Sequence, residues 1–103
     1  MREHNYYVYI LTNKNKTVLY VGMTNHLQTR LIQHKKGVIT GFTQKYNCHY
    51  LVHLEHFTEV SAAIDREKQL KKWSRRKKMD AIEKTNSHWQ FLDEEVLKNN
   101  ARL

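Results

Sequence analysis

Two short runs of aromatic and β-branched residues open the chain, at residues 6–11 and 18–23. Such composition is typical of β-strands, and the polar stretch 12–17 between them has the residues of a turn. Because so few residues separate the two runs, we expect them to pair as an antiparallel hairpin. Its six-residue loop is longer than a tight two-residue turn.

A helical pattern follows the hairpin, with Leu27 and Leu31 four residues apart. Asn25 is the predicted N-cap, and Gln28 stands where the second member of a capping box would lie. Gly37 is placed to end this helix, because glycine readily adopts the left-handed conformation found at helix C-termini. The sequence therefore predicts a helix that begins just after Asn25 and ends at Gly37.

Residues 38–47 contain a glycine and several polar side chains, and we expect them to form a loop. Residues 48–57 alternate well enough between apolar and polar positions to predict a third strand, with Tyr50, Val52 and Leu54 on one face. Three strands with helices around them can bury a core, whereas an isolated hairpin is marginally stable.

From residue 58 the apolar positions recur every three or four residues, which indicates a helix with Thr58 as its N-cap. A break near Ser74 separates this helix from a second one over residues 75–84, in which Met79 and Ile82 face inward. The apolar stripe of the first of these helices comprises Val60, Ala63, Ile64, Leu70 and Trp73.

Apolar residues at positions 89, 92 and 96 predict a last helical segment that packs back on the body. The predicted order is β-β-α-β-α-α, an α/β (α+β) fold in which helices flank a small three-stranded antiparallel sheet. A chain of 103 residues makes one domain. We expect its core at about residues 6–89 and a C-terminal helical extension at residues 90–103.

The charge of the chain adds a first hint of function. Eighteen Lys and Arg against ten Asp and Glu give a net charge of +8, and a basic surface attracts polyanions such as nucleic acid. A protein that is basic without binding nucleic acid explains the charge equally well. The single cysteine, Cys48, excludes an intrachain disulfide, and no apolar run is long enough for a signal peptide or a membrane span. We therefore expect a cytoplasmic protein that does not contact membranes.

Two tyrosines of the predicted hairpin are the first candidates for chemistry. Strand periodicity puts Tyr9 on one face of the first strand and Tyr20 on one face of the second, so the two rings can meet. Tyrosine is also among the residues that strands favour for packing alone. Taken by itself, the pair therefore favours a packing role.

Arg30 and His34 lie four residues apart on the first predicted helix, which makes them neighbours on its surface. Their face adjoins the stripe of Leu27 and Leu31, and we expect them at the edge between helix and sheet, where a cleft can form. An exposed basic pair on a solvated face is the alternative. The two interpretations have equal weight.

Glu67 is a polar position within an apolar pattern. Continuing the helical stripe from Ala63 by threes and fours leads to Glu67 and then to Leu70. A carboxylate in such a stripe destabilises the fold unless it is paired or binds a cation. The alternative is an ordinary pair of Glu67 with Lys71 one helical turn later, which contributes little to stability.

The densest cluster of positive charge runs from Lys71 to Lys78 and has Trp73 inside it. Such a cluster suits phosphate contacts, although the helix dipole also favours cations near a helix C-terminus. The histidines between residues 49 and 56 match no zinc-site spacing, and we expect them to be structural or exposed. The predicted nucleic-acid contacts are Lys35, Lys45, Lys71, Lys72, Arg75, Arg76 and Lys77.

Two triplets and one helix in this chain resemble the GIY-YIG nuclease domain. Residues 7–9 (YVY) stand where that family has its first signature triplet, and residues 20–22 (YVG) where it has the second. Arg30 and His34 match the family's R-x-x-x-H helix at the same separation. Tyr7 departs from the pattern, because glycine is usual at that position.

The resemblance continues to the end of the predicted core. Glu67 is similar to the family's metal-binding glutamate, and Asn86 to the asparagine that closes the domain, although Ser87 follows it where proline is frequent. The likeness covers about residues 6–89. It is strongest to stand-alone, single-domain bacterial members and to the nuclease module of the excision-repair incision subunit.

The resemblance implies hydrolysis of phosphodiesters with a single divalent metal ion, Mg²⁺ or Mn²⁺. Glu67 would hold the metal, and Arg30 would stabilise the extra negative charge of the transition state. Tyr9 would orient or deprotonate the attacking water, and for deprotonation its pKa must be depressed from ~10. The residues that would hydrogen-bond or support this network are Tyr20, His34 and Asn86.

We therefore expect a metal-dependent endonuclease that acts on DNA, ahead of RNA, in DNA repair or recombination. A repair or recombination protein is a candidate partner. The alternative is a catalytically weak or inactive nucleic-acid-binding module, because we expect no appended domain that would select a target. The sequence leaves the structure of the substrate and the oligomeric state open.

Overall fold

The structure, a computed structural model, describes residues 4–38 and 41–100. The start of the chain, residues 39–40 of the predicted loop and residues 101–103 of the predicted extension lie outside the described residues. In chain order the elements are β1 (Tyr6–Thr12), β2 (Leu19–Thr24), α1 (Leu27–Lys36), α2 (Phe42–Lys45), β3 (Tyr50–Phe57), α3 (Val60–Lys72), α4 (Arg75–Thr85) and α5 (Asp93–Asn100).

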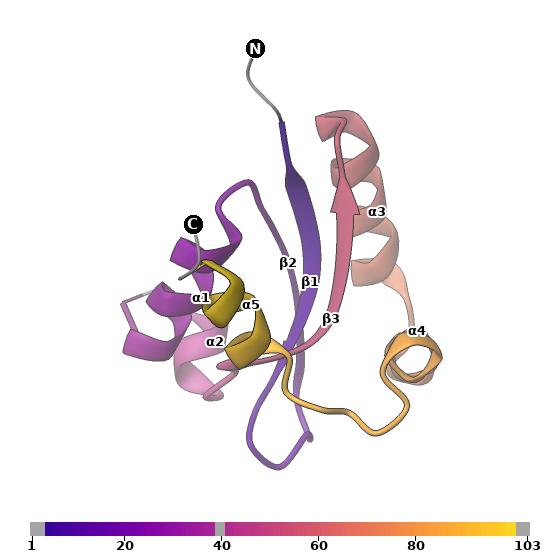
Figure 1. The fold of residues 1–103 in the computed structure, drawn as a ribbon. Helices are drawn as coiled ribbons and strands as arrows, with labels where there is room; N and C mark the ends of the chain where they lie inside the picture. Colours follow the sequence, from indigo (N-terminus) through magenta and orange to yellow (C-terminus); the bar gives the residue numbers. More distant parts are fainter. Residues whose placement is uncertain (1–3, 39–40, 101–103) are drawn as a thin grey trace.

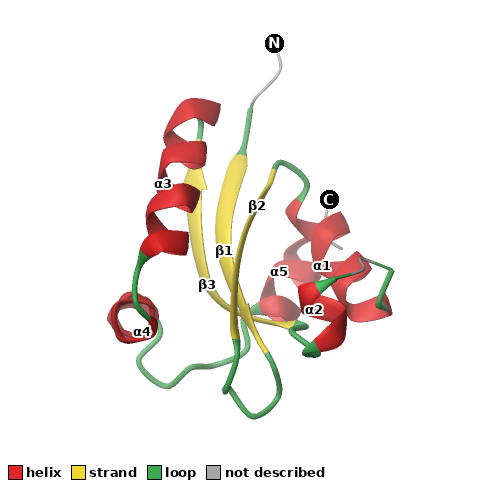
Figure 2. Ribbon diagram, turned by 180° about the vertical axis from the view of Figure 1, so that it is seen from behind, coloured by secondary structure: helices red, strands yellow, loops and turns green. Residues whose placement is uncertain are grey.

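The three strands form one antiparallel sheet in the order β2-β1-β3, so the first strand lies in the middle. Helices α1, α2 and α5 lie on one face of this sheet, and α3 and α4 lie on the other (Figure 1). Figure 2 shows the same three layers from behind. The predicted mixed fold, a small three-stranded antiparallel sheet flanked by helices, is confirmed.

β1 divides the apolar interior into two clusters, because its side chains alternate between the two faces of the sheet. Val8 and Ile10 pack with buried residues of α3 and α4. Tyr9 and Leu11 pack with residues of α1 and α5. The predicted hairpin thus supplies both halves of the core, and it places Tyr9 on the α1 side.

A β-bulge in β3 changes the face that some of its residues occupy. Two successive residues of β1 pair with His53 and Leu51, which leaves Val52 without a partner in the ladder. Val52 packs in the cluster beneath α3 and α4, but Leu54 packs in the cluster beneath α1 and α5. The prediction that Tyr50, Val52 and Leu54 share one face is therefore wrong, because strict alternation fails at a bulge.

Two predicted helix starts are wrong by one residue. The N-cap of α1 is His26 instead of Asn25, and no side chain caps that end, so the expected capping box is absent. The N-cap of α3 is Glu59 instead of Thr58, again without a side-chain cap. The break at Ser74 is confirmed, because its hydroxyl caps α4 by accepting a hydrogen bond of 3.2 Å from a backbone amide of the first turn.

Gly37 ends α1 as predicted, in the left-handed conformation with φ of 70°. The segment that was expected to be a loop contains α2, a single turn of four residues. One turn is too short to show a periodic apolar pattern, which is why the sequence did not indicate it. This short helix places Phe42 beside Tyr20 and Thr43 beside His34.

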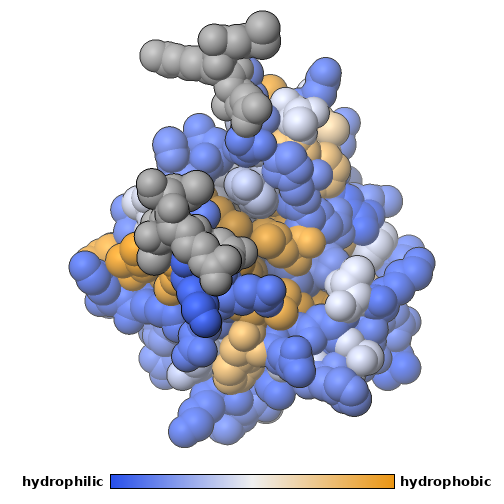
Figure 3. Space-filling view, in the orientation of Figure 1, coloured by the Kyte–Doolittle hydropathy of each residue, from blue (hydrophilic) through white to orange (hydrophobic). Residues whose placement is uncertain are grey.

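The surface is mostly hydrophilic, although apolar residues reach it in patches, one of them on the side that carries α1 and α2 (Figure 3). Exposed large apolar residues include Ile32, Val38 and Phe42. None of the described helices is both long and apolar enough to cross a membrane.

Candidate active site

Tyr9 lies at the centre of the candidate site, on the middle strand of the sheet. Only 1% of its surface is exposed. Its partner in the ladder between β1 and β2 is Gly22, and a Cβ atom at position 22 would lie 2.5 Å from both Cζ and the hydroxyl oxygen of Tyr9. The phenol ring therefore passes directly over the backbone of β2, and only glycine leaves room for it.

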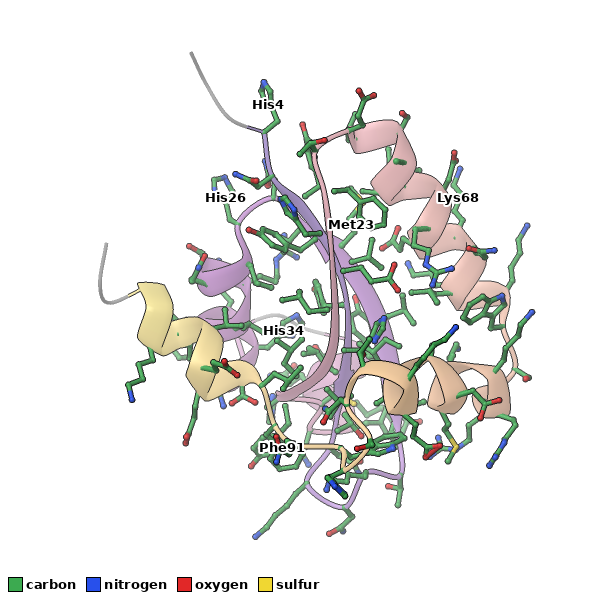
Figure 4. All side chains as sticks on the ribbon, turned by 45° about the vertical axis from the view of Figure 1, so that its right-hand side comes forward. His4, Met23, His26, His34, Lys68 and Phe91 are labelled. Atoms are coloured by element: carbon green, nitrogen blue, oxygen red, sulfur yellow. The ribbon has the colours of Figure 1, made fainter. Side chains whose placement is uncertain are left out.

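His34 holds the phenol from the α1 side. The Tyr9 hydroxyl lies 3.3 Å from His34 Nε2, and Thr43 Oγ1 lies 3.2 Å from His34 Nδ1. When Nδ1 carries the ring proton it donates to Thr43, and Nε2 accepts the hydroxyl hydrogen of Tyr9. Burial, and then the charge of Arg30, lowers the pKa of His34 to about 4, so the imidazole is neutral at pH 7. Figure 4 shows His34 projecting from its helix toward the strands.

Three more groups act electrostatically on the Tyr9 phenol. Burial raises the pKa of Tyr9, Tyr20 and Glu67 raise it further, and the positive charge of Arg30 opposes them. The resting protein therefore holds Tyr9 as a neutral phenol. These groups come from β2, α1 and α3, so the fold gathers around Tyr9 the other four residues that the sequence singled out.

Tyr20 extends the site toward the surface through a row of aromatic rings. Its ring centre lies 6.0 Å from that of His34 and 5.9 Å from that of Phe42. The ring of Phe42 in turn lies 4.6 Å from that of Tyr46. Phe42 and Tyr46 are 45% and 41% exposed. The sequence did not indicate either of these rings or Thr43, because α2 is too short to show a periodic pattern.

Glu67 approaches the site from the opposite face of the sheet, because α3 packs against β1 and β2 there. Its side chain is 22% exposed, and its carboxylate lies 3.3 Å from Lys71 Nζ. The fully buried residues of α3 are Ala63 and Leu70. Glu67 thus occupies the margin of the apolar stripe, and the i, i+4 pair that was the alternative interpretation is present.

A divalent cation fits this site with Glu67 as a protein ligand. Within residues 4–38 and 41–100, no three or more His, Cys, Asp or Glu side chains gather closely enough to form a metal cage. Mg²⁺ is commonly held through one or two carboxylates, several waters and the oxygens of a bound phosphate. The partly exposed carboxylate of Glu67 meets that requirement, so the donor set fits a metal that protein and substrate hold together.

Asn86 supports the fold of β3. Its amide nitrogen donates to the carbonyl oxygens of Val52 at 3.0 Å and Gln90 at 2.8 Å, and its Oδ1 accepts from the Gln90 amide at 2.9 Å. Val52 is the residue that the bulge leaves unpaired, so Asn86 satisfies a carbonyl group that the ladder leaves free. These bonds engage both polar atoms of the Asn86 side chain with backbone.

Lys35, one of the predicted nucleic-acid contacts, forms an ion pair within the protein. Its Nζ lies 2.7 Å from Asp93 Oδ2. Asp93 is 2% exposed and also accepts a hydrogen bond of 3.2 Å from the Leu51 amide. The pair ties α5 to both α1 and β3, and it thereby steadies the helix that carries Arg30 and His34.

The cations of α3 and α4 divide between the two edges of the sheet. Lys71, Arg75 and Lys78 line hollows beside β2. Lys77 instead faces the β3 side, with its Nζ 4.8 Å from the ring centre of Trp73. The sequence analysis did not include Lys78 among the nucleic-acid contacts. The other predicted contacts lie on the exposed surface, namely Lys45 beside Tyr46, Lys72, and Arg76 beside Asp80.

Two adjoining hollows of 230 and 260 Å³ run along the edge strand β2, and we call them the β2 groove. One wall comes from α2 and the other from α3 and α4. The groove reaches Tyr20, so it is continuous with the candidate site. The residues that define it are Leu19, Tyr20, Phe42, Lys71, Arg75 and Lys78.

A larger hollow of 870 Å³, the β3 pocket, lies at the other edge of the sheet. Arg66 donates to both carboxylate oxygens of Glu55, at 2.8 and 3.0 Å, and His53 Nε2 lies 2.7 Å from Glu55 Oε2. The hydrogen bond from His53 and the bonds and charge of Arg66 lower the pKa of Glu55 to about 2. The residues that define the pocket are His53, Glu55, Arg66, Trp73, Lys77 and Lys84.

Known proteins share the sequence pattern of this chain. A sequence profile of the GIY-YIG catalytic domain matches residues 5–80. A UPF0213 protein of Natronomonas pharaonis is 38% identical over 74 residues, which cover 72% of this chain and 86% of that protein. A UPF0213 protein of Syntrophus aciditrophicus is 40% identical over 77 residues, which cover 74% and 87% of the two chains.

The fold has a solved counterpart as well. The solution NMR structure of a UPF0213 protein from Bacillus halodurans is similar, with a TM-score of 0.55 and 29% identity, over 82% of this chain and 89% of that one. The profile match contains Tyr9, Tyr20, Arg30, His34 and Glu67, and it ends before α5. By its motifs, its sheet and these matches, the chain belongs to the GIY-YIG catalytic-domain family.

Proposed function

We propose that the protein is a metal-dependent endonuclease that hydrolyses phosphodiester bonds in DNA. The observation that carries the proposal is the setting of Tyr9, a buried phenol that contacts a neutral histidine. The ring of Tyr20 lies next to that histidine and lines a groove that also carries cations. Membership of the GIY-YIG catalytic-domain family supports a nuclease-type role. The net charge of +8 agrees with a polyanionic substrate.

Arg30 binds the scissile phosphate. Among the described residues no carboxylate forms an ion pair with its guanidinium, so its hydrogen-bond donors are available to an incoming anion. The planar fork of an arginine matches the geometry of phosphate oxygens. Because negative charge on these oxygens grows in the transition state, Arg30 binds the transition state more strongly than the substrate.

Glu67 would hold the metal. A divalent ion such as Mg²⁺ or Mn²⁺ bound there would supply charge neutralisation at the phosphate and at the leaving oxygen. The carboxylate pairs with Lys71 in the free protein. Lys71 also lines the adjoining β2 groove, where its ammonium group would contact a phosphate of the bound strand.

Tyr9 and His34 move the proton of the attacking water. The water oxygen forms a bond to phosphorus as the bond to the leaving oxygen breaks, and the leaving oxygen takes a proton from solvent. The water proton passes to the Tyr9 oxygen while the hydroxyl hydrogen of Tyr9 passes to His34 Nε2, 3.3 Å away. This transfer avoids a free phenolate, which burial disfavours. Phosphate bound to Arg30 offsets the positive charge that lowers the pKa of His34, so His34 accepts a proton more readily in the complex.

Cleavage assays with matched variants test this function. The substrates are labelled duplex, single-stranded and branched DNA, each with Mg²⁺ or Mn²⁺. We expect Glu67→Gln, Arg30→Ala and Tyr9→Phe each to slow cleavage by roughly 10²- to 10³-fold, the range seen when one transition-state contact or catalytic group is removed. Asp65→Asn is the control, because Asp65 is exposed on the same helix as Glu67.

Asp65→Asn is expected to cut at the wild-type rate. Equal cutting by the wild type and Glu67→Gln would show that the activity comes from a contaminant or does not use this site. Wild-type cutting without any divalent ion would contradict the metal dependence while leaving the hydrolase in place.

Binding without cleavage is the second candidate function. One observation favours it, because burial raises the pKa of Tyr9 and lowers that of His34, so the resting site holds no strong base. Salt-dependent binding of DNA, with no cleavage of any of the three substrates under either metal, would support this function over the first.

We expect the activity to serve DNA repair or recombination, because the site residues are similar to those of the excision-repair nuclease module. Faster cutting of flaps or junctions than of plain duplex would support this role. Equal cutting of all substrates would instead favour a less selective activity. Mass spectrometry after capture of the native protein would reveal a repair or recombination partner.

A further inference from the structure

The β2 groove carries more aromatic surface than the hydrolytic residues require. A row of rings leads from the candidate site to the surface, from Tyr20 to Phe42 and from Phe42 to Tyr46, with centre separations of 5.9 and 4.6 Å. Tyr20 and Phe42 are near parallel, at 26°. The two outer rings are 45% and 41% exposed, so packing in the core accounts for only part of their surface.

The charged side chains that line the groove are all positive, although Lys71 also pairs with Glu67. Lys71 and Lys78 line the groove beside Phe42, Arg75 lies at its far end, and Lys45 Nζ lies 5.4 Å from the ring centre of Tyr46. A ligand that suits both features has flat π-faces for the rings and negative charge for the cations. An unpaired nucleotide has both, and base–aromatic stacking with a cationic backbone track is the usual way in which proteins bind single strands.

Duplex DNA and a second copy of this chain suit the groove less well. The base faces of a duplex stack on one another and are closed to side chains unless the helix is opened. A second copy would bring a second set of Lys71, Arg75 and Lys78 against the first, and like charges that face each other across an interface are unfavourable.

We propose that Phe42 and Tyr46 form a stacking subsite for unpaired bases of the DNA strand that is cut. This inference rests on the proposed function, from which it takes the position of the cut. The scissile phosphate lies at Arg30, the strand then follows β2, and Lys71 and Lys78 contact its next phosphates. The substrate is therefore single-stranded DNA or DNA with an unpaired segment next to the cut.

Binding measured without metal tests the subsite independently of cleavage. The probe is a fluorescent single-stranded oligodeoxynucleotide in the presence of a chelator, compared with its duplex and with RNA of the same sequence. We expect Phe42→Ala and Tyr46→Ala each to weaken single-strand binding by roughly tenfold, within the range for one lost stacking contact. Duplex binding should change by less than about twofold, because backbone contacts dominate it.

Three further variants make the result specific. Phe42→Trp restores a π-face and is expected to bind the single strand as tightly as the wild type. Phe42→Leu keeps an apolar side chain of similar size but has no ring, and it is expected to bind as weakly as Phe42→Ala. Ile32→Ala removes an exposed apolar side chain of α1 outside the groove and should change nothing.

Several outcomes would overturn the subsite. Equal losses on single strand and duplex would show that Phe42 only maintains the fold. Full binding by Phe42→Leu would show an apolar contact instead of stacking, and tighter binding of RNA would exclude DNA as the ligand. A concentration-dependent mass that Phe42→Ala abolishes would assign the rings to self-association. Cleavage of duplex that needs Glu67, together with unchanged single-strand binding by Phe42→Ala, would reject the subsite and leave the nuclease intact.

Discussion

The two edges of the sheet differ in whether their charged side chains are paired with one another. At the β3 edge, Glu55 binds both Arg66 and His53, and all three side chains contribute to the wall of the same pocket. At the β2 edge, Lys78 faces a groove and forms no ion pair with any carboxylate in the described part of the chain. The network around Glu55 is complete in the free protein, whereas Lys78 is available to an anion.

This difference shows that the size of a hollow is a poor guide to function here. The β3 pocket measures 870 Å³, against 230 and 260 Å³ for the two parts of the β2 groove. A large pocket is ordinarily the first candidate for a ligand site. The smaller groove nevertheless reaches Tyr20, whose ring lies 6.0 Å from that of His34. Burial and charge shift the pKa values of His34 and Tyr9 behind it, and residues with such shifts are candidates for a functional site.

Adding one methyl group at the β2 edge is expected to have the largest effect. In Gly22→Ala the new Cβ would lie 2.5 Å from the Tyr9 ring, so the ring must move away from His34. We expect a loss of roughly 10²-fold in cleavage rate, the effect of misplacing a catalytic group by about 1 Å. Overpacking should also lower the free energy of unfolding by about 1–3 kcal/mol. Single-turnover cleavage and urea denaturation measure the two effects.

A double variant separates the clash from other consequences of that substitution. In Tyr9→Leu the ring is gone, so adding Gly22→Ala to it should cost much less stability than the same change costs in the wild type. Equal costs in both backgrounds would contradict the crossing of Tyr9 over Gly22.

The charge network of the β3 edge is expected to contribute to stability and not to cleavage. The pKa of Glu55 falls from 4.5 to about 2 on folding, so its contribution is fully present above pH 4.5 and is lost as the pH falls through about 2. Glu55→Gln should lower the free energy of unfolding at pH 7 by roughly 2 kcal/mol. Urea denaturation across this pH range should show the difference from the wild type shrinking toward acid pH.

Asp65→Asn serves as the matched control, since Asp65 is exposed in the interior of α3 and forms no ion pair with a described residue. It should unfold like the wild type at every pH. A deficit of Glu55→Gln that does not depend on pH, or a large loss of cleavage in that variant, would remove the distinction between the two edges.

Neighbouring lysines of α4 give the smallest and most direct comparison. Lys78 lines the β2 groove, whereas Lys77 lies over Trp73 at the β3 pocket. Lys78→Ala should weaken DNA binding about threefold and reduce the slope of log affinity against log salt by about 1, as expected for one lost phosphate contact. Lys77→Ala should leave both unchanged. Titrations at several salt concentrations measure this, and equal effects would mean that nucleic acid contacts both edges.

Much of the fold could be predicted from the sequence because its signals are local. The aromatic and β-branched runs of the hairpin, the stripe of α3, the break at Ser74 and the glycine that ends α1 each depend on a few adjacent residues. The bulge in β3 was not predictable, because it arises from register against β1, which is far away in sequence. The single turn of α2 was not predictable for a different reason, since four residues are too few to show a repeating apolar pattern.

The sequence by itself determined that the residue types of the family's motifs are present in the family's order, from Tyr9 and Tyr20 to Glu67. Only the tertiary structure decided how they meet, with the Tyr9 ring over Gly22 and its hydroxyl against His34. The tertiary structure alone also decided that Lys78 faces the β2 groove while Lys77 lies over Trp73, and that Phe42 lies beside Tyr20. The physical reason is that periodicity reports the face of an element on which a side chain lies. Contacts between elements depend on register, crossing and packing, which arise only when the whole chain is folded.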